Sequence, residues 1–97
     1  MSAEQIIEAI NNELSGEDNK AVKISKILLL ISGNDDSKFN RILIVLQNIV
    51  SATLDTVTVE SIFSSTASPN EKVGAFINLL AKDDPEKYNK VSQILTS

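Results

Sequence analysis

The segment Phe39–Leu54, FNRILIVLQNIVSATL, is the longest and most apolar stretch of this chain that fits a single helix. Placed at about 100° per residue, its apolar side chains form one broad stripe, which Val45 and Ala52 widen past half of the circumference. A helix that is apolar over so much of its surface is buried by neighbours on several sides. The segment therefore predicts the central helix of a small all-α domain. The stripe comprises Phe39, Ile42, Leu43, Leu46, Ile49, Val50 and Leu54.

The rest of the chain carries start and stop signals for further helices. Ser2 and Gln5 have the spacing of a capping box, and Ser68-Pro69-Asn70-Glu71 places Ser at an N-cap, Pro at the first helical position and Glu at the third. Gly33-Asn34 suits a left-handed helix end. The expected helices run from Ser2 to a glycine cap at Ser15-Gly16, from Asp18 or Asn19 to Ser32, through the central segment behind Asp35, Asp36 or Ser37, from about Val59 to Ser65, from Ser68 onward, and from Asp84 onward.

These signals predict an all-α fold, a compact bundle of five to six helices that forms a single helical domain over residues 1–97. In the second helix, the expected core face comprises Ala21, Ile24, Ile27, Leu28 and Ile31. The alternation Thr56-Val57-Thr58-Val59 is typical of a strand, but a lone strand has no partner elsewhere in the chain. We therefore expect a loop there, followed by the short helix.

An internal similarity appears when the chain is shifted against itself by 49 positions, which brings Lys23 onto Lys72 (72 − 23) without a gap. The loop residue Asp35 then meets Asp84, and polar as well as apolar positions agree. We interpret the chain as two pseudo-repeated three-helix units, residues 1–48 and 49–97, packed face to face. Chance similarity between two amphipathic helical hairpins is the alternative, and the sequence leaves it open.

The composition excludes several kinds of chemistry. The chain has no Cys and no His, so it lacks thiol nucleophiles, thiolate metal sites, the commonest general base and the commonest transition-metal ligand. The paired carboxylates Asp35-Asp36 and Asp83-Asp84 lack the spacing of a calcium-binding loop and are typical of helix caps. We therefore expect no enzyme activity, no cofactor, no metal site and no small-molecule substrate.

Apolar side chains outside the helical stripes indicate a surface that binds another protein. Ile44 lies on the polar arc of the central helix, Leu30 lies between Lys23 and Lys26, and Val22 and Leu29 add a second apolar edge to their helix. A contiguous exposed apolar patch marks a partner site. The hypothesis is a non-enzymatic protein–protein interaction module, an adaptor, regulator or accessory factor, with a homodimer as the simplest way to cover such a patch.

Nucleic-acid binding is an alternative function. Lys20, Lys23 and Lys26 are spaced by three on one helix and, with Lys38 and Arg41, could contact phosphates. The net charge of −4 argues against it, because phosphate binding requires clustered basic residues. The sequence therefore makes nucleic acid an unlikely partner in comparison with protein.

A further alternative comes from the segment Gly33-Asn34-Asp35-Asp36-Ser37-Lys38-Phe39. It resembles the phosphopantetheine attachment site of acyl carrier proteins, in which a Gly-x-Asp-Ser-Leu run opens a helix. The resemblance covers seven residues and implies an acyl-carrier-like protein modified at Ser37. Lys38 stands where the family has Leu, and an additional Asp intervenes.

The N-terminal residues and the apolar runs predict a cytoplasmic protein. The chain begins without a basic region followed by an apolar core, so we expect no signal peptide. Its longest apolar runs, Ile27–Ile31 and Ile42–Leu46, are far shorter than the ~20 residues that span a bilayer.

Overall fold

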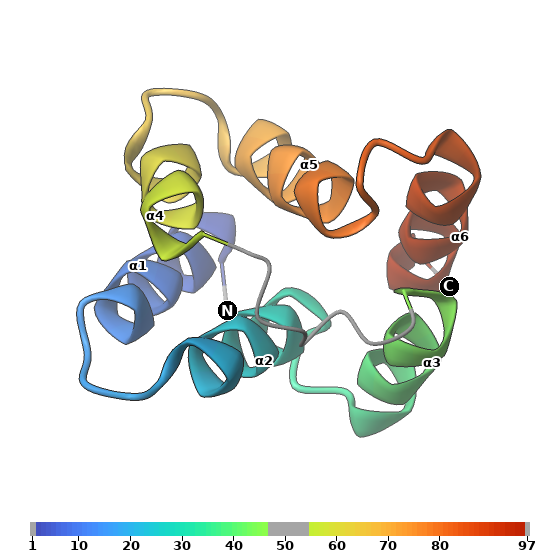
Figure 1. The fold of residues 1–97 in the computed structure, drawn as a ribbon, viewed down its shortest axis with the longest axis horizontal. Coiled ribbons are helices and arrows are strands. Elements are labelled where there is room, and N and C mark those ends of the chain that lie inside the picture. The colour runs from blue at the N-terminus through green and yellow to red at the C-terminus, as the bar shows by residue number, and fades with distance from the viewer. Residues whose placement is uncertain (1, 47–54, 97) are drawn as a thin grey trace.

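Six helices make up the part of the chain that this computed structural model describes, residues 2–46 and 55–96. No strand occurs in these two ranges, so the predicted all-α class is confirmed. The helices are α1 (Ala3–Leu14), α2 (Lys20–Ile31), α3 (Asp36–Leu46), α4 (Thr56–Ser64), α5 (Pro69–Leu80) and α6 (Pro85–Thr96), in the order shown in Figure 1.

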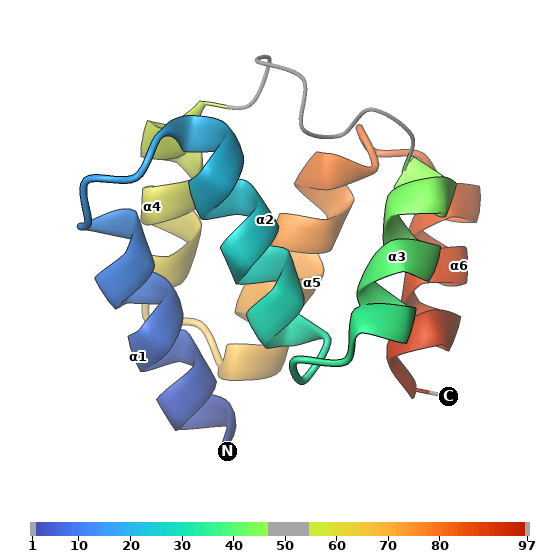
Figure 2. The same ribbon diagram turned by 90° about the horizontal axis from the view of Figure 1, so that it is seen from below.

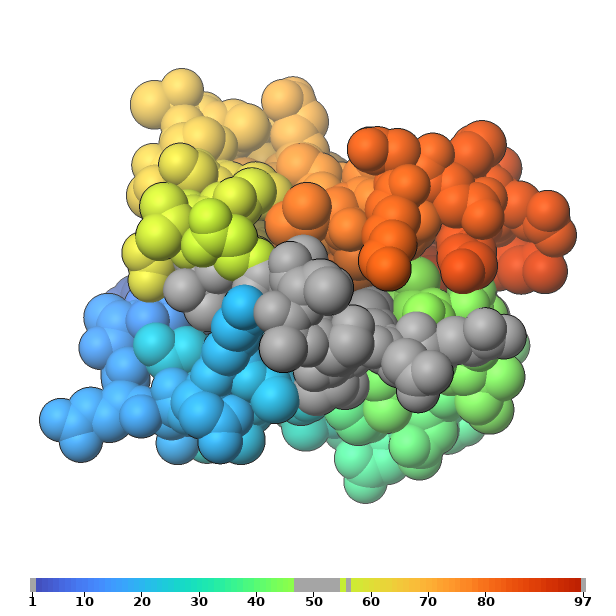
Figure 3. Space-filling view, viewed as in Figure 1, coloured from blue at the N-terminus to red at the C-terminus, as the bar shows by residue number. Residues whose placement is uncertain are grey.

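The helices form a compact bundle of two layers. In Figure 1, α1, α2 and α3 lie side by side in the lower half, and α4, α5 and α6 lie above them. The two layers contact each other where α1 packs against α4 and where α3 packs against α6. Figure 2 shows both chain ends at one end of the bundle, and the space-filling view in Figure 3 shows the two layers meeting across one face.

The core receives fully buried side chains from all six helices, including Ile10, Ile27, Ile42, Phe63 and Phe76. The rings of Phe63 and Phe76 lie 5.4 Å apart between centroids and are tilted by 55°, a favourable aromatic geometry that joins α4 to α5. Burial of each such side chain contributes about 1.5 to 3 kcal/mol. The helices therefore share one core.

The helix starts follow the sequence signals. The Ser2 hydroxyl oxygen accepts a hydrogen bond from the backbone N–H of Gln5, and the Gln5 side-chain oxygen accepts one from the backbone N–H of Ser2, so the predicted capping box is confirmed. Asn19 and Ser68 cap α2 and α5 in the same way, each by its side-chain oxygen. Gly33 and Asn34 have φ angles of 71° and 61°, which confirms the left-handed turn after α2.

The prediction of one central helix over Phe39–Leu54 is wrong in position. The described helix α3 runs from Asp36 to Leu46 and packs against α2 and α6 at one side of the bundle, while residues 47–54 lie outside the described residues. Phe39, Leu43 and Val45 on α3 stay half-buried, so its apolar stripe is not covered on every side. Apolar width shows how much surface a helix could bury, but the number of neighbouring helices decides how much it does bury.

Three smaller predictions also differ from the structure. The cap of α1 is Ser15, and Gly16 does not adopt a positive φ, so the expected glycine cap is wrong. Ala21 is exposed rather than part of the core face of α2. Helix α4 begins at Thr56, earlier than expected, because the Asp55 side chain accepts a hydrogen bond from the backbone N–H of Val57 and starts the helix there.

Several features recur between the two halves at the shift of 49 positions. The left-handed residues Gly33 and Asn34 correspond to Lys82 and Asp83, which also have positive φ angles, 54° and 61°. Helices α2 and α5 begin and end at corresponding residues. The packing of α1 against α4 and of α3 against α6 fits a pseudo-twofold relationship. The two-unit interpretation stays a prediction, and these correspondences support it.

Candidate functional site

Among the described residues, two large apolar side chains are strongly exposed. Ile44 on α3 is 74% exposed, and Val57 on α4 is 66% exposed. At the shift of 49 positions they correspond to Gln93 and Glu8, which are also exposed. If the two-unit interpretation holds, polar side chains at the corresponding positions indicate that the fold does not require apolar residues there.

The other predicted partner-binding residues are less accessible than Ile44. Leu30 is half-buried and packs against the core, so most of its apolar surface is used within the bundle. Val22 and Leu29 on α2 are half-buried. Their assignment to a partner site stays a prediction. Val57 was not predicted as an exposed residue, although its alignment with Glu8 in the internal similarity was a signal for it.

The lysines proposed for nucleic-acid binding contact their own chain. The Lys23 ammonium donates a hydrogen bond to the backbone carbonyl of Leu14 at 2.9 Å. Lys26 forms an ion pair with Asp18 at 2.7 Å, and its ammonium lies 3.9 Å from a carboxylate oxygen of Glu13. Lys23 and Lys26 thus have intramolecular carbonyl or anionic partners, which weakens the case for a phosphate-binding face.

The carboxylates beside Lys26 have opposite pKa shifts. A hydrogen bond shared with Asp18 raises the pKa of Glu13 above its usual value, and burial adds to this rise. The hydrogen bond from Lys26 lowers the pKa of Asp18 below its usual value. One oxygen of Glu13 is buried without a hydrogen-bond partner, which fits a carboxyl group that retains its proton more readily than a free one. The cluster joins the end of α1 to α2.

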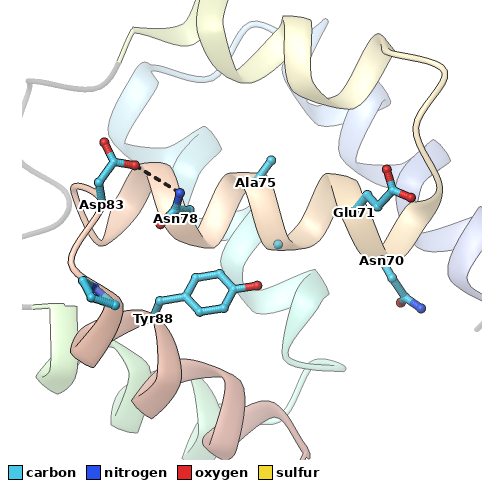
Figure 4. A pocket seen from close by; sticks show the side chains of 8 residues that line it. Asn70, Glu71, Ala75, Asn78, Asp83 and Tyr88 are labelled. Atoms are coloured by element: carbon cyan, nitrogen blue, oxygen red, sulfur yellow. Dashed lines mark hydrogen bonds between the residues drawn. The ribbon is translucent and has the colours of Figure 1, made fainter.

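A groove of about 700 Å³ runs between α5 and α6 (Figure 4). We call it the α5–α6 groove. Asn78 donates a hydrogen bond of 3.0 Å to the carboxylate of Asp83, and this bond holds the acidic group at one end of the groove. The carboxylate of Glu71 lies toward the other end. The lining residues are Asn70, Glu71, Gly74, Ala75, Asn78, Asp83, Pro85 and Tyr88.

Gly74 and Tyr88 determine the shape of this groove. In Figure 4, the ring of Tyr88 lies alongside α5. A methyl group added at Gly74 would lie 3.0 Å from the Tyr88 hydroxyl oxygen, so the glycine leaves room for the phenol. The corresponding pair in the first half is Ser25 and Phe39. An isolated glycine within a helix was the sequence signal that could have drawn attention to this place.

A smaller, apolar cavity of about 270 Å³ opens at the end of the bundle where the two layers meet. Side chains from α1, α2, α5 and α6 line it, and Asn70 lines both this cavity and the α5–α6 groove. The lining residues are Ala3, Ile6, Ile7, Ile31, Pro69, Asn70, Val73 and Leu95. Asn70 is the one polar side chain in this lining, so the cavity offers a polar ligand a single hydrogen-bonding side chain.

The remaining sequence candidates lie on exposed loop and helix ends. Ser37 is exposed in the first turn of α3, and its modification stays a prediction. Asp35 and Asp84 accept hydrogen bonds from backbone N–H groups at the starts of α3 and α6, which confirms their predicted role as caps. The residues in the described ranges form no group of three or more potential metal ligands, and no helix there has both the length and the apolarity needed to cross a bilayer.

Comparisons of the chain with protein-family models, with curated proteins and with solved structures found no match in any of the three.

Proposed function

We propose that this protein is a non-enzymatic helical module that binds another protein, or a second copy of itself, through a surface centred on Ile44. The exposure of Ile44 carries this proposal. An isoleucine side chain left in water forgoes about 1.5 to 3 kcal/mol of burial free energy, which an interface can recover. The chain itself offers a polar alternative at the corresponding position, Gln93, which indicates that isoleucine is not needed for folding.

Self-association is the first version to test, because it needs no knowledge of a partner. Sedimentation equilibrium over a range of protein concentrations would compare the wild-type protein with Ile44→Gln. If the surface mediates a homodimer, the substitution weakens dimerisation about tenfold, which corresponds to about 1.4 kcal/mol. The matched control is Gln93→Ala, an exposed position on α6 that should leave the dimer unchanged.

A heterologous partner is the second version. The wild-type protein, Ile44→Gln and Gln93→Ala would each be used as bait in the native cell, with retained proteins identified by mass spectrometry. The proposal expects one or more proteins that bind the wild type and the control but not Ile44→Gln. A monomeric wild type whose set of retained proteins is the same for Ile44→Gln would contradict the proposal.

A further inference from the structure

We propose that the α5–α6 groove binds an extended protein segment that carries two basic side chains, one at each end of the groove, with the ring of Tyr88 along its α6 side. This proposal names the chemistry of a partner and a second surface. It does not depend on Ile44, so either surface can fail its test without the other.

The charge of the groove favours a cationic occupant. Its lining includes the carboxylates of Glu71 and Asp83 and no Lys or Arg. The amide groups of Asn70 and Asn78 add hydrogen-bonding capacity along the same side. Lys72, the basic residue beside Glu71 in the sequence, directs its ammonium to the backbone carbonyl of Phe63 and so is occupied within the fold. The groove therefore complements positive charge.

Tyr88 adds an aromatic surface along the α6 side of the groove, below α5 in Figure 4, whereas the two carboxylates lie above α5 in that view. Its side chain is half-buried, so part of the ring is accessible from the groove. A guanidinium or ammonium group over a tyrosine ring gains about 0.5 to 1 kcal/mol at an exposed site. Arginine fits this place better than lysine, because its planar group stacks on a ring and also donates hydrogen bonds to carboxylates.

The separation of the two carboxylates sets the spacing of the basic residues. Glu71 and Asn78, the partner of Asp83, are seven residues apart on α5, which corresponds to roughly 10 Å along the helix axis. In a polyproline II segment, residues three apart lie on the same face and are separated by about 9 Å. A segment with arginines at positions i and i+3 therefore matches the groove.

The first half of the chain does not repeat this chemistry. At the shift of 49 positions, Glu71 and Asn78 correspond to Val22 and Leu29, and Asp83 corresponds to Asn34. The corresponding side chains carry no negative charge. The cationic site is therefore expected only on the α5–α6 side, and the α2–α3 side serves as an internal comparison.

The test is a titration with a blocked peptide, Ala-Arg-Pro-Pro-Arg-Ala, followed by the backbone amide signals of the full-length protein in NMR spectra. The expected result is a set of chemical-shift changes concentrated at Gly74, Asn78, Asp83 and Tyr88. Added salt should weaken binding, because the interaction is between exposed charges. A peptide with glutamine in place of both arginines should bind at least about fivefold more weakly.

The decisive variant is the double substitution Glu71→Gln and Asp83→Asn, which removes both charges and keeps side-chain size. Asparagine tolerates the positive φ of residue 83, so the fold should be retained. We expect this variant to weaken binding about fivefold. The control, Glu4→Gln with Glu17→Gln, makes the same change in net charge at exposed positions outside the groove and should bind like the wild type.

Three results would overturn the proposal. The first is a set of shift changes spread over the acidic surface instead of the groove. The second is equal loss of affinity in the groove variant and the control, which would reflect net charge alone. The third is equal binding of the arginine and glutamine peptides. None of these results depends on the oligomeric state or on Ile44→Gln. The proposed function, which rests on Ile44, is therefore tested separately.

Discussion

The ammonium group of Lys23 binds the backbone carbonyl of Leu14, the last residue of α1, at 2.9 Å. The same interaction recurs in the second half, where Lys72 binds the carbonyl of Phe63 at 3.2 Å. The last carbonyls of a helix have no hydrogen-bond partner within it and carry partial negative charge. The ammonium group of a lysine from the next helix provides both a hydrogen-bond donor and a compensating positive charge. Each bond links the first helix of its unit to the second.

Replacing Lys23 by methionine tests the strength of this link. We expect Lys23→Met to lower the free energy of unfolding by about 1 to 2 kcal/mol, because the charged hydrogen bond is lost while the aliphatic stem is kept. The effect of Lys72→Met should be smaller, below about 1 kcal/mol, because the carbonyl of Phe63 also accepts a hydrogen bond from Asn11. Urea denaturation would measure both values, and equal losses would contradict this account.

The left-handed turns predict opposite effects for corresponding substitutions. Gly33→Ala should destabilise the protein by about 1 kcal/mol, because a residue with a side chain is strained at a φ of 71°. Lys82→Gly should stabilise it by up to about 1 kcal/mol, since Lys82 already bears that strain at a φ of 54°. Thermal and urea unfolding of the two variants would show the signs. A gain from Gly33→Ala would be inconsistent with the turn geometry.

The close approach of Gly74 and Tyr88 predicts that substitutions at these two positions have coupled effects on stability. Alanine in the middle of a helix is ordinarily more stable than glycine by about 0.5 to 1 kcal/mol. At Gly74 the added methyl group meets the Tyr88 hydroxyl oxygen at 3.0 Å, so the gain should be reduced or lost. In the Tyr88→Phe background, Gly74→Ala should recover most of it. A double-mutant cycle by urea denaturation measures the coupling, and additive effects would show that the two groups do not interfere.

Stability should depend on pH through Glu13. The pKa of Glu13 is raised in the folded state, so its protonated form favours folding below the unfolded pKa, and this contribution is lost as pH rises through the folded value. Glu13→Gln stays neutral and avoids that loss. The melting temperature of Glu13→Gln should therefore increase relative to the wild type as pH rises from 4 toward 7. Glu17→Gln, which changes an exposed carboxylate near the same helix end, is the control.

Asp18 should respond to pH in the opposite direction. Its pKa is lowered by Lys26, so its contribution to stability is present above the unfolded pKa and is lost as pH falls through the folded value. Asp18→Asn should reduce the melting temperature at pH 7 and make little difference at a pH below the folded pKa. A penalty of equal size at both pH values would show that the hydrogen bond, and not the charge, is what matters.

Substitutions at core and at surface positions should differ clearly in how much they lower the free energy of unfolding. Phe76→Ala removes one ring of the buried pair with Phe63 and should cost about 3 to 5 kcal/mol. Ile44→Ala should change the stability of the monomer by less than about 0.5 kcal/mol, because the side chain is mostly in water. Circular dichroism during urea unfolding would measure both. A large loss for Ile44→Ala would assign it to folding and not to binding.

The starts of α1, α2 and α5 were readable from local sequence. Ser2, Asn19 and Ser68 cap their helices through hydrogen bonds to groups three residues away, so the signal and the structure lie within one turn. The same holds for the left-handed pair Gly33-Asn34. The all-α class follows from the period of the apolar residues together with these caps.

The position of α3 and the candidate surfaces depended on contacts between distant segments. The sequence places a broad apolar stripe on α3 with Ile44 outside it, but only the packing against α2 and α6 shows how much of that stripe is buried. The α5–α6 groove has its shape because the Tyr88 side chain packs close to Gly74, a residue fourteen positions before it in the chain (88 − 74). Local hydrogen bonds are encoded within a turn, whereas burial and grooves arise from how whole helices are placed against one another.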